Sequence, residues 1–276
     1  MHAPIGVGFI AWILEKGTPS STDLLDVALE NRVKAIWLAF GNSLGKWVSY
    51  IRDYDQRRAD GHKTLIFAQL SSVEEALVAV NDWKVDILVA QGIESGGHGR
   101  ASAPPLLTLI SSLLEVVPQN GPLIVAAGGL ANGGHVAACL TLGASGVAMG
   151  TRFLLTPESL YTDAQRMALI AAGTDSTVRS FVFDRARGTL GWPTGIDGRA
   201  LMNQTVRDVE AGVPIEDVQR AFRQGVEDGD PSRMLIWAGT GVSLMNQIKG
   251  ATDVVAELHQ EVVDHLERAS LITSSA

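Results

Sequence analysis

Short apolar runs recur at fairly regular intervals through the first half of the chain. They are rich in Val, Ile and Leu, and their hydrophobicity is continuous rather than alternating with polar residues. Strands buried on both faces of a parallel sheet have this pattern. We therefore predict six strands, at residues 5–10, 35–40, 64–70, 85–90, 123–127 and 146–149.

Stretches with helical periodicity lie between these runs, and some start with a capping residue. Ser72 and Glu75 predict a capping box, in which the hydroxyl and the carboxylate accept hydrogen bonds from free amides at a helix start. Thr22 or Asp23 could cap another helix. Alternating strands and helices imply right-handed parallel crossovers, hence an α/β fold with either a barrel or an open doubly wound sheet.

The pattern changes from residue 157 onward. Helices are predicted at 163–172, 215–225 and 254–271, whereas 188–195 is too rich in glycine and proline to be regular structure. We therefore predict a β/α barrel portion over 1–156 and a helical extension over 157–276 that packs on it.

Charge and cysteine content narrow the class of protein. The formal net charge is −8, with no extended basic cluster, so nucleic acid is not an expected partner. The lone cysteine, Cys139, excludes an internal disulfide framework and is expected to be an inert core residue. No His, Asp or Glu spacing suggests a metal site. Residues 5–14 are too few to span a bilayer and are better interpreted as a buried strand, so we expect a cytoplasmic protein without membrane contact.

Two glycine-rich loops each follow a predicted strand. Strand 123–127 leads into Gly128 and Gly129, and strand 146–149 leads into Gly150 and Thr151. Glycines at a strand end let backbone amides approach an anion, and in TIM barrels the last two such loops often bind phosphate. The pair therefore predicts a phosphorylated ligand, and a plain strand-to-helix turn is the alternative for either loop alone.

His98 lies on a third loop, which directly follows strand 85–90 and is flanked by glycines. Histidine titrates near neutrality, so it could accept a proton from a weak carbon acid or hydrogen-bond an anionic product. A hydrogen-bonded loop histidine without a catalytic role is the alternative. Residues 41–45 match the G-x-S-x-G pattern of a serine hydrolase around Ser43, but so loose a pattern favours an ordinary loop.

The chain resembles the nitronate monooxygenases, also called 2-nitropropane dioxygenases, in three blocks: QGIESGGHG at 91–99, AAGGLANG at 126–133 and LGASGVAMGTRF at 142–153. The similarity continues through 192–199 and 237–242, so it covers most of the chain. The resemblance implies a TIM-barrel-type fold, flavin mononucleotide (FMN), and the oxidation of an alkyl nitronate with O2 to a carbonyl compound and nitrite.

The same resemblance implies roles for individual residues. His98 would be catalytic, drawing the α-proton from a nitroalkane or hydrogen-bonding the nitronate. The remaining candidates would bind the cofactor: Gly128, Gly129, Gly150 and Thr151 at the phosphate, Gln69 and Gln91 near the flavin ring or ribityl chain, and Gly96 and Gly97 where close approach is needed.

The sequence departs from the family pattern at its start. Family members begin with two strands that have no counterpart here, so the six predicted strands would correspond to strands three to eight. A barrel lacking two neighbouring strands exposes two sheet edges, which favours association into a homo-oligomer. An incomplete gene model, completion by another subunit and a degenerate homologue are the three explanations.

Two other functions fit the same features. One is an FMN-dependent enoyl reductase or dehydrogenase acting on a biosynthetic intermediate, and the other is a non-catalytic homologue that serves as a binding subunit. The physiological substrate does not follow from the sequence. Trp12, Trp192 and Trp237 could form the apolar wall of a substrate pocket, although core packing is the commoner role of such residues.

Overall fold

Six parallel strands form the larger of two sheets in the computed structural model, which describes residues 4–17 and 19–274. Their order in the sheet is the order of the chain: β1 (Gly6–Ile10), β2 (Ala35–Ala39), β3 (Leu65–Leu70), β4 (Ile87–Gln91), β6 (Leu123–Ala127) and β7 (Gly146–Ala148). All six predicted strands are confirmed, and so is their parallel pairing.

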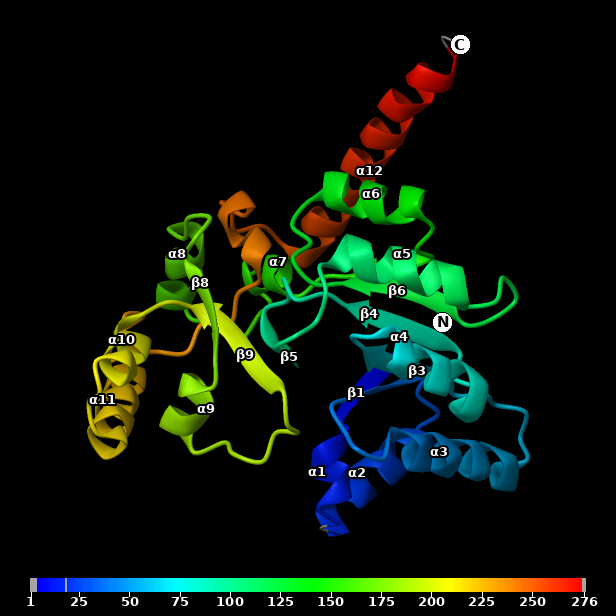
Figure 1. Cartoon of the computed structure of the whole chain (residues 1–276), viewed down its shortest axis with the longest axis horizontal. Coiled ribbons are helices and arrows are strands. Elements are labelled where there is room, and N and C mark those ends of the chain that lie inside the picture. The colour runs from blue at the N-terminus through cyan, green and yellow to red at the C-terminus, as the bar shows by residue number, and fades with distance from the viewer. Residues whose placement is uncertain (1–3, 18, 275–276) are drawn as a thin grey trace.

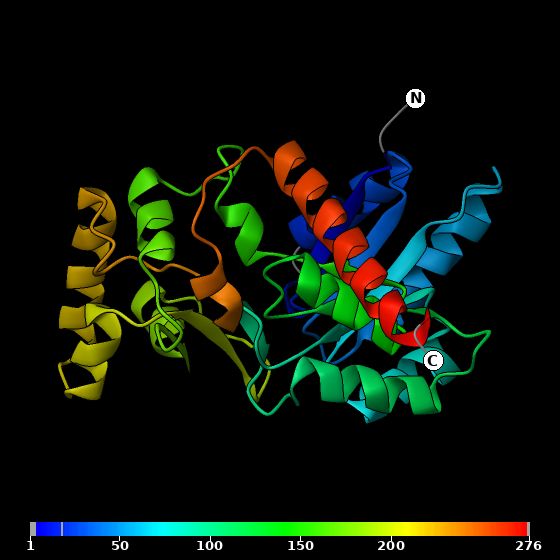
Figure 2. The ribbon, with the colours of Figure 1, turned by 90° about the horizontal axis from the view of Figure 1, so that it is seen from above.

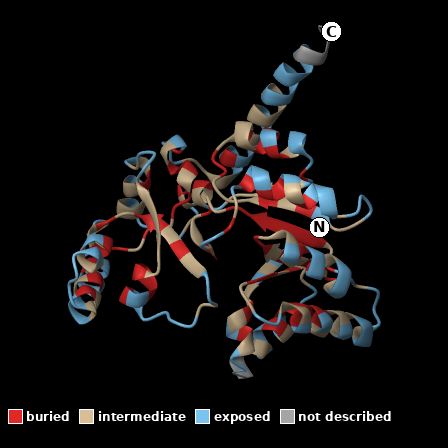
Figure 3. Cartoon of the chain, in the orientation of Figure 1, coloured by how far each residue is buried: buried red, intermediate tan, exposed pale blue. Residues whose placement is uncertain are grey.

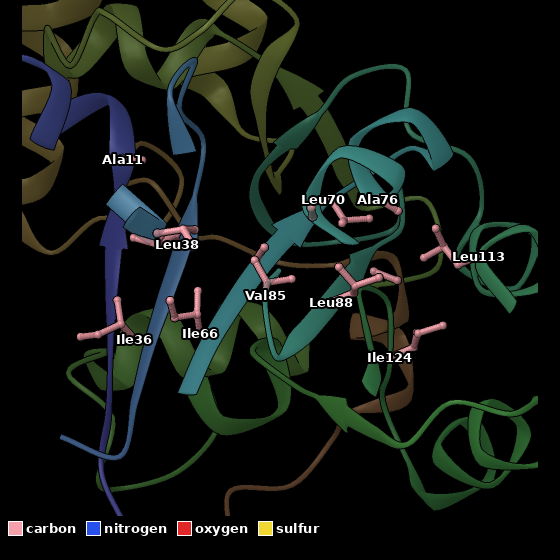
Figure 4. Close-up of a cluster of buried hydrophobic side chains, with 14 of the residues drawn as sticks. Ala11, Ile36, Leu38, Ile66, Leu70, Ala76, Val85, Leu88, Leu113 and Ile124 are labelled. Atoms are coloured by element: carbon pink, nitrogen blue, oxygen red, sulfur yellow. The ribbon is translucent and has the colours of Figure 1, made fainter. Parts of the chain in front are cut away.

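Helices cover the large sheet and bury its apolar side chains. Ile36, Ile66, Leu88 and Ile124, each from a different strand, lie in one continuous core (Figure 4). Buried residues concentrate on these strands, whereas the outer faces of the helices are exposed (Figure 3). The helices of this part are α1 (Ala11–Glu15), α2 (Pro19–Glu30), α3 (Leu44–Arg58), α4 (Val73–Val78), the π-helical turn η1 (Ala79–Trp83), α5 (Leu106–Val116), α6 (Gly133–Leu142) and α7 (Thr151–Leu154).

The large sheet is an open part of a barrel. Among the described residues, β1 and β7 each pair with one strand and not with each other, so they are the edges. The six βα units and the incomplete barrel that the sequence predicts are therefore both confirmed.

A smaller antiparallel sheet joins the two halves of the chain. Its strands are β5 (Gly97–Arg100), β9 (Ile196–Leu201) and β8 (Thr177–Ser180), in that order. The helical extension predicted after residue 157 is confirmed as mainly helical, but it also contains β8 and β9, which the sequence did not predict. These strands are short and carry glycines and charged side chains, which give little strand propensity. The division at residue 156 stays a prediction, although this sheet takes one strand from before it and two from after it.

Helices make up the rest of the second half. They are α8 (Asp163–Ile170), α9 (Val182–Arg187), α10 (Gln204–Glu210), α11 (Ile215–Asp228), the 3-10 turn η2 (Thr240–Leu244) and α12 (Ala251–Ser274). Helices α10 and α11 lie on the far side of the small sheet from the large one (Figures 1 and 2). Helix α12 packs on α6 and then projects from the molecule. The three predicted helices are confirmed, and 188–195 contains no helix or strand.

Three local expectations are corrected by the structure. The Ser72 hydroxyl does accept from the Glu75 amide, but the Glu75 carboxylate accepts from the amide of Ser71 instead of closing the box on Ser72. Helix α2 begins at Pro19, so Thr22 and Asp23 lie inside it rather than at its start. The apolar stretch at 5–14 is a strand only to Ile10, where α1 follows.

Two further expectations concern burial and membranes. Cys139 is buried in α6, and burial raises the pKa of its thiol, as expected for a core residue. Among the helices of the described residues, none is long and apolar enough to cross a bilayer.

Candidate active site

A cavity of about 310 Å³ lies at the carboxyl ends of the central strands of the large sheet. Strand β3 carries Gln69, β4 ends at Gln91, and the two glycine-rich loops follow β6 and β7. The structure brings nearly all the predicted cofactor residues together in its lining: Gln69, Gln91, Gly96, Gly128, Gly129, Gly150 and Thr151.

The loop after β6 adopts a backbone that requires glycine. Gly128 and Gly129 have φ angles of +112° and +71°, a region that side chains disfavour. A Cβ on Gly129 would lie 2.6 Å from Cβ of Glu94, so a side chain there would displace the neighbouring loop. At these two glycines the wall of the cavity is therefore backbone that no side chain covers.

Gly150, on the loop after β7, is a glycine for a different reason. Its backbone is right-handed, and a Cβ added there would meet nothing within 4 Å. The protein's own packing therefore does not require a glycine, and the space beside it is open to a ligand. The neighbouring Thr151 hydroxyl accepts a hydrogen bond from the Gly239 amide at 3.0 Å, which ties the loop to the segment before η2.

Two polar atoms at the cavity are buried without a partner in the described residues. They are Oε1 of Gln91 and Oγ of Ser95. The other end of the Gln91 amide is used, because Nε2 donates to the backbone oxygen of His98 at 3.1 Å. Unpaired buried polar atoms cost free energy, so a ligand that formed hydrogen bonds to them would be stabilised at this position.

Glu94 holds the loop that carries these groups. Its carboxylate accepts from the Leu106 amide at the start of α5, at 3.0 and 3.1 Å. Its backbone oxygen accepts from the Thr240 amide at 3.0 Å. Arg199 donates to the backbone oxygen of Ile93 at 3.1 Å, which adds a third anchor. The loop is therefore fixed from three sides rather than flexible.

His98 lies on β5, paired with Gly198 of β9, and its ring contacts side chains of the second half of the chain. Its Nε2 lies 2.9 Å from Oδ2 of Asp184, a carboxylate in α9 that is completely buried. One ring face stacks on Trp192 with centroids 3.5 Å apart, and Trp237 meets the ring edge-on at 4.9 Å. His98 and Gly97 are not among the residues that line the cavity at the strand ends, which Gly128, Gly129 and Gly150 line.

The electrostatics of Asp184 follow from its partners. Burial alone would raise the pKa of this carboxyl, but hydrogen bonds from His98, Thr189 and Trp192 and the charge on His98 outweigh it, so the pKa is lowered. The carboxylate is therefore the stable form inside the protein.

Several residues of the site escaped prediction. Ser95 and Gly239 line the cavity, and only their proximity to predicted glycines could have indicated them. Asp184 has no local sequence signal at all, because it meets His98 only through the fold. Trp192 and Trp237, which are candidates for the wall of a substrate pocket, both pack against His98, and Trp12 lies edge-on to Trp192.

The alternative sites have less support. Ser43 is exposed, and its amide donates to Glu15 at 2.8 Å. Within the described part of the chain, no hydrogen bond joins its hydroxyl to a histidine. Gly45 is explained by packing, since a Cβ there would lie 2.4 Å from the Trp83 ring. The described residues contain no cluster of three or more His, Cys, Asp or Glu side chains that could hold a metal ion.

Comparisons with known proteins identify one family and also find a relative described as a dehydrogenase. A family model described as nitronate monooxygenase matches residues 15–261. A nitronate monooxygenase of Metarhizium robertsii is 33% identical over 94% of this chain and 73% of its own length. The crystal structure of a nitroalkane oxidase from Streptomyces ansochromogenes has a TM-score of 0.70 and 28% identity, over 90% of this chain and 68% of that one. A carboxyl-CoA dehydrogenase of Mycobacterium tuberculosis is 39% identical over 51% of this chain and 36% of its own.

Proposed function

The chain belongs to the nitronate monooxygenase family, and from that premise we propose that it is an FMN-dependent enzyme that oxidises an alkyl nitronate with O2 to a carbonyl compound and nitrite. The family and its relatives make the chain an oxidoreductase of the monooxygenase type. The observation that carries the finer proposal is the single cavity lined by nearly all the predicted cofactor residues.

The residues present fit FMN. The open space beside Gly150, next to the hydroxyl of Thr151 and the bare backbone of Gly128 and Gly129, suits a phosphate, which backbone amides bind well. The unpaired Oε1 of Gln91 is a hydrogen-bond acceptor, which matches the N–H group of a flavin ring or a ribityl hydroxyl. The Gln69 carbonyl is held at 3.0 Å by the Trp37 indole, which fixes its amide at the same wall.

Bound FMN would supply the redox chemistry and the reaction with O2. The chain itself would orient the substrate and handle its proton. His98 would accept the α-proton of a neutral nitroalkane or donate a hydrogen bond to a nitronate oxygen. Gln91 connects the proposed cofactor site with the proposed base, because its side chain lines the cavity and donates to the backbone oxygen of His98.

An absorbance spectrum tests the cofactor, and oxygen uptake tests the reaction. The purified chain is incubated with FMN, desalted and scanned, and a retained flavin band is expected. The loaded protein should then consume O2 and release nitrite when propyl-2-nitronate is added. A protein that keeps no flavin, or that keeps it and neither consumes O2 nor releases nitrite, would overturn this proposal.

A dehydrogenase is the second candidate function. The carboxyl-CoA dehydrogenase relative favours it, because it is 39% identical to this chain over the stretch that it matches, which is 51% of the chain. The two functions differ in the electron donor. Rapid bleaching of the flavin band by NADH or NADPH would favour the dehydrogenase, whereas anaerobic bleaching by a nitronate would favour the monooxygenase.

A further inference from the structure

Asp184 is a buried carboxylate whose orientation is fixed by three hydrogen bonds. Its Oδ1 accepts from the Thr189 hydroxyl at 2.8 Å and from the Trp192 indole at 3.1 Å. Its Oδ2 is left for Nε2 of His98 at 2.9 Å. Within the described residues, His98 is the one basic side chain close enough to form an ion pair with it when protonated. Thr189 and Trp192 therefore fix the carboxylate in the orientation in which Oδ2 faces the His98 ring.

The His98 ring is fixed as firmly as its partner. Trp192 stacks on it with an angle of 12° between the ring planes, and Trp237 packs against it at 63°. Trp237 can take this position only because residue 198 is glycine, since a Cβ on Gly198 would lie 2.4 Å from the Trp237 ring. The side chain of His98 is 10% exposed, so these neighbours cover most of the ring and leave a small part of it open to a substrate.

The hydrogen bond between the two side chains determines where the imidazole proton lies. A carboxylate can only accept, so the neutral ring that donates to Asp184 carries its proton on Nε2. The lone pair is then on Nδ1, and within the described residues no hydrogen bond engages that atom. A nitrogen with a free lone pair is the one that can act as a base.

We propose that Asp184 is a positioning residue that holds His98 in the Nε2–H tautomer, so that Nδ1 is the atom that exchanges a proton with the substrate. The catalytic half of this inference rests on the proposed function. In that reaction the α-C–H bond of a neutral nitroalkane breaks, its electron pair stays on the nitronate, and the proton moves to Nδ1. Asp184 remains ionised and balances the charge of the imidazolium that forms.

The tautomer can be measured without any activity, by ¹⁵N NMR of the His98 ring nitrogens in the full chain at a pH where the ring is neutral. The wild type should show a protonated Nε2 and an unprotonated Nδ1. In Asp184→Asn the amide oxygen can keep Thr189 and Trp192, while the amide nitrogen donates to Nε2, so the proton should move to Nδ1. A wild-type proton on Nδ1 would overturn the inference, and so would a variant that leaves the pattern unchanged.

Two controls separate positioning from general damage. Thr189→Val removes a hydrogen bond from the same carboxylate but not from the oxygen that faces His98, so the His98 tautomer should not change. His135 serves as an internal reference, because its Nδ1 accepts from the Ala131 amide and its spectrum should be the same in every variant. Should Asp184→Asn fail to fold, the wild-type spectrum alone still decides which nitrogen carries the proton.

Turnover then tests the catalytic half. Asp184→Asn should slow the oxidation of a neutral nitroalkane on the order of 10²-fold, because the lone pair has moved, and should affect a preformed nitronate much less. An equal loss with both substrates would overturn the role of Nδ1 as the base. A wild type that oxidises neither substrate would overturn the proposed function instead, and the NMR result would still stand.

Discussion

Two regions of the molecule are built in opposite ways. One is the glycine cavity, which lies at the strand ends of the large sheet and is lined by Gly128, Gly129 and Gly150. The other is the His98 cluster, in which Asp184, Trp192 and Trp237 surround the His98 ring. The predicted glycines of the cavity, Gly128, Gly129 and Gly150, stand on loops that each directly follow a strand, so each belongs to a short motif in the sequence. The cluster consists of side chains, and it joins residue 98 to residues 184, 192 and 237. A site made by local backbone can be predicted from a motif, whereas a site made by distant side chains requires the fold.

His98→Ala should produce the largest effect and should separate the two regions. Loss of the proposed base is expected to slow oxidation of a neutral nitroalkane by about 10²–10⁴-fold. FMN retention should be unchanged, because His98 does not line the cavity. Oxygen uptake and the desalted absorbance spectrum measure the two properties on the same sample.

A matched histidine in the large-sheet region provides the control for that substitution. Nε2 of His62 lies 3.1 Å from the backbone oxygen of Val33, and His62 does not line the cavity. His62→Ala should therefore leave turnover unchanged. Loss of flavin together with activity in His98→Ala would show that the cavity and the cluster form one site.

Gly129→Ala and Gly150→Ala should have the next largest effects, and of different kinds. At Gly129 the φ angle of +71° and the nearby Glu94 side chain oppose a methyl group, so we expect a loss of about 2–4 kcal/mol in the free energy of unfolding. At Gly150 the methyl group meets no protein atom, so stability should change by less than about 0.5 kcal/mol. Urea unfolding measures both.

FMN titration of Gly150→Ala tests whether the open space beside this residue holds the cofactor. Gly150→Ala should weaken FMN binding about tenfold, which is roughly 1.4 kcal/mol, because its methyl group fills the space assigned to the ligand. Unchanged FMN affinity in that folded variant would mean that FMN does not approach the loop after β7. The proposed assignment of the phosphate to this loop would then be wrong.

The large sheet could be predicted from sequence because its signals are local. Continuous apolar runs such as 123–127 favour strands, of which Ile124 and Ala126 are buried here, and glycines such as Gly128 mark where they end. The small sheet could not, because β5 and β9 contain glycine, histidine and arginine and are strands only through pairing with each other. The same limit applies to Asp184, whose partner is 86 positions away in the chain.

Tyr50 and Tyr161 test the two regions at high pH. The pKa of Tyr50 is raised to about 12 by its hydrogen bond to Asp26 and by burial, and that of Tyr161 is raised to about 12 by burial. Unfolded tyrosine has a pKa near 10, so the stability from these neutral phenols is fully present below pH 10 and lost as the pH rises toward 12. Each should contribute about 1–2 kcal/mol.

Replacement by phenylalanine separates the two contributions. Tyr50→Phe and Tyr161→Phe should each flatten part of the fall in unfolding free energy between pH 10 and 12, as followed by urea titrations at several pH values. Tyr161→Phe also removes the acceptor of the Trp237 amide, so it should cost about 1 kcal/mol at neutral pH as well. A variant that keeps the full alkaline loss would show that its tyrosine is not the group responsible.

Helix caps give the smallest expected effect, and they test whether the two regions unfold together. Ser72 caps α4 beside the large sheet, and Thr162 caps α8 in the second half through a complete capping box with Gln165. Replacement of either by alanine should cost about 1 kcal/mol. Because β5 pairs with β9 and Arg199 binds the backbone of Ile93, we expect one cooperative unit, in which either substitution speeds hydrogen exchange in β4 and β9 alike. If Ser72→Ala affects only β4 and Thr162→Ala only β9, the regions unfold independently, and the contact between cavity and cluster is weaker than these bonds suggest.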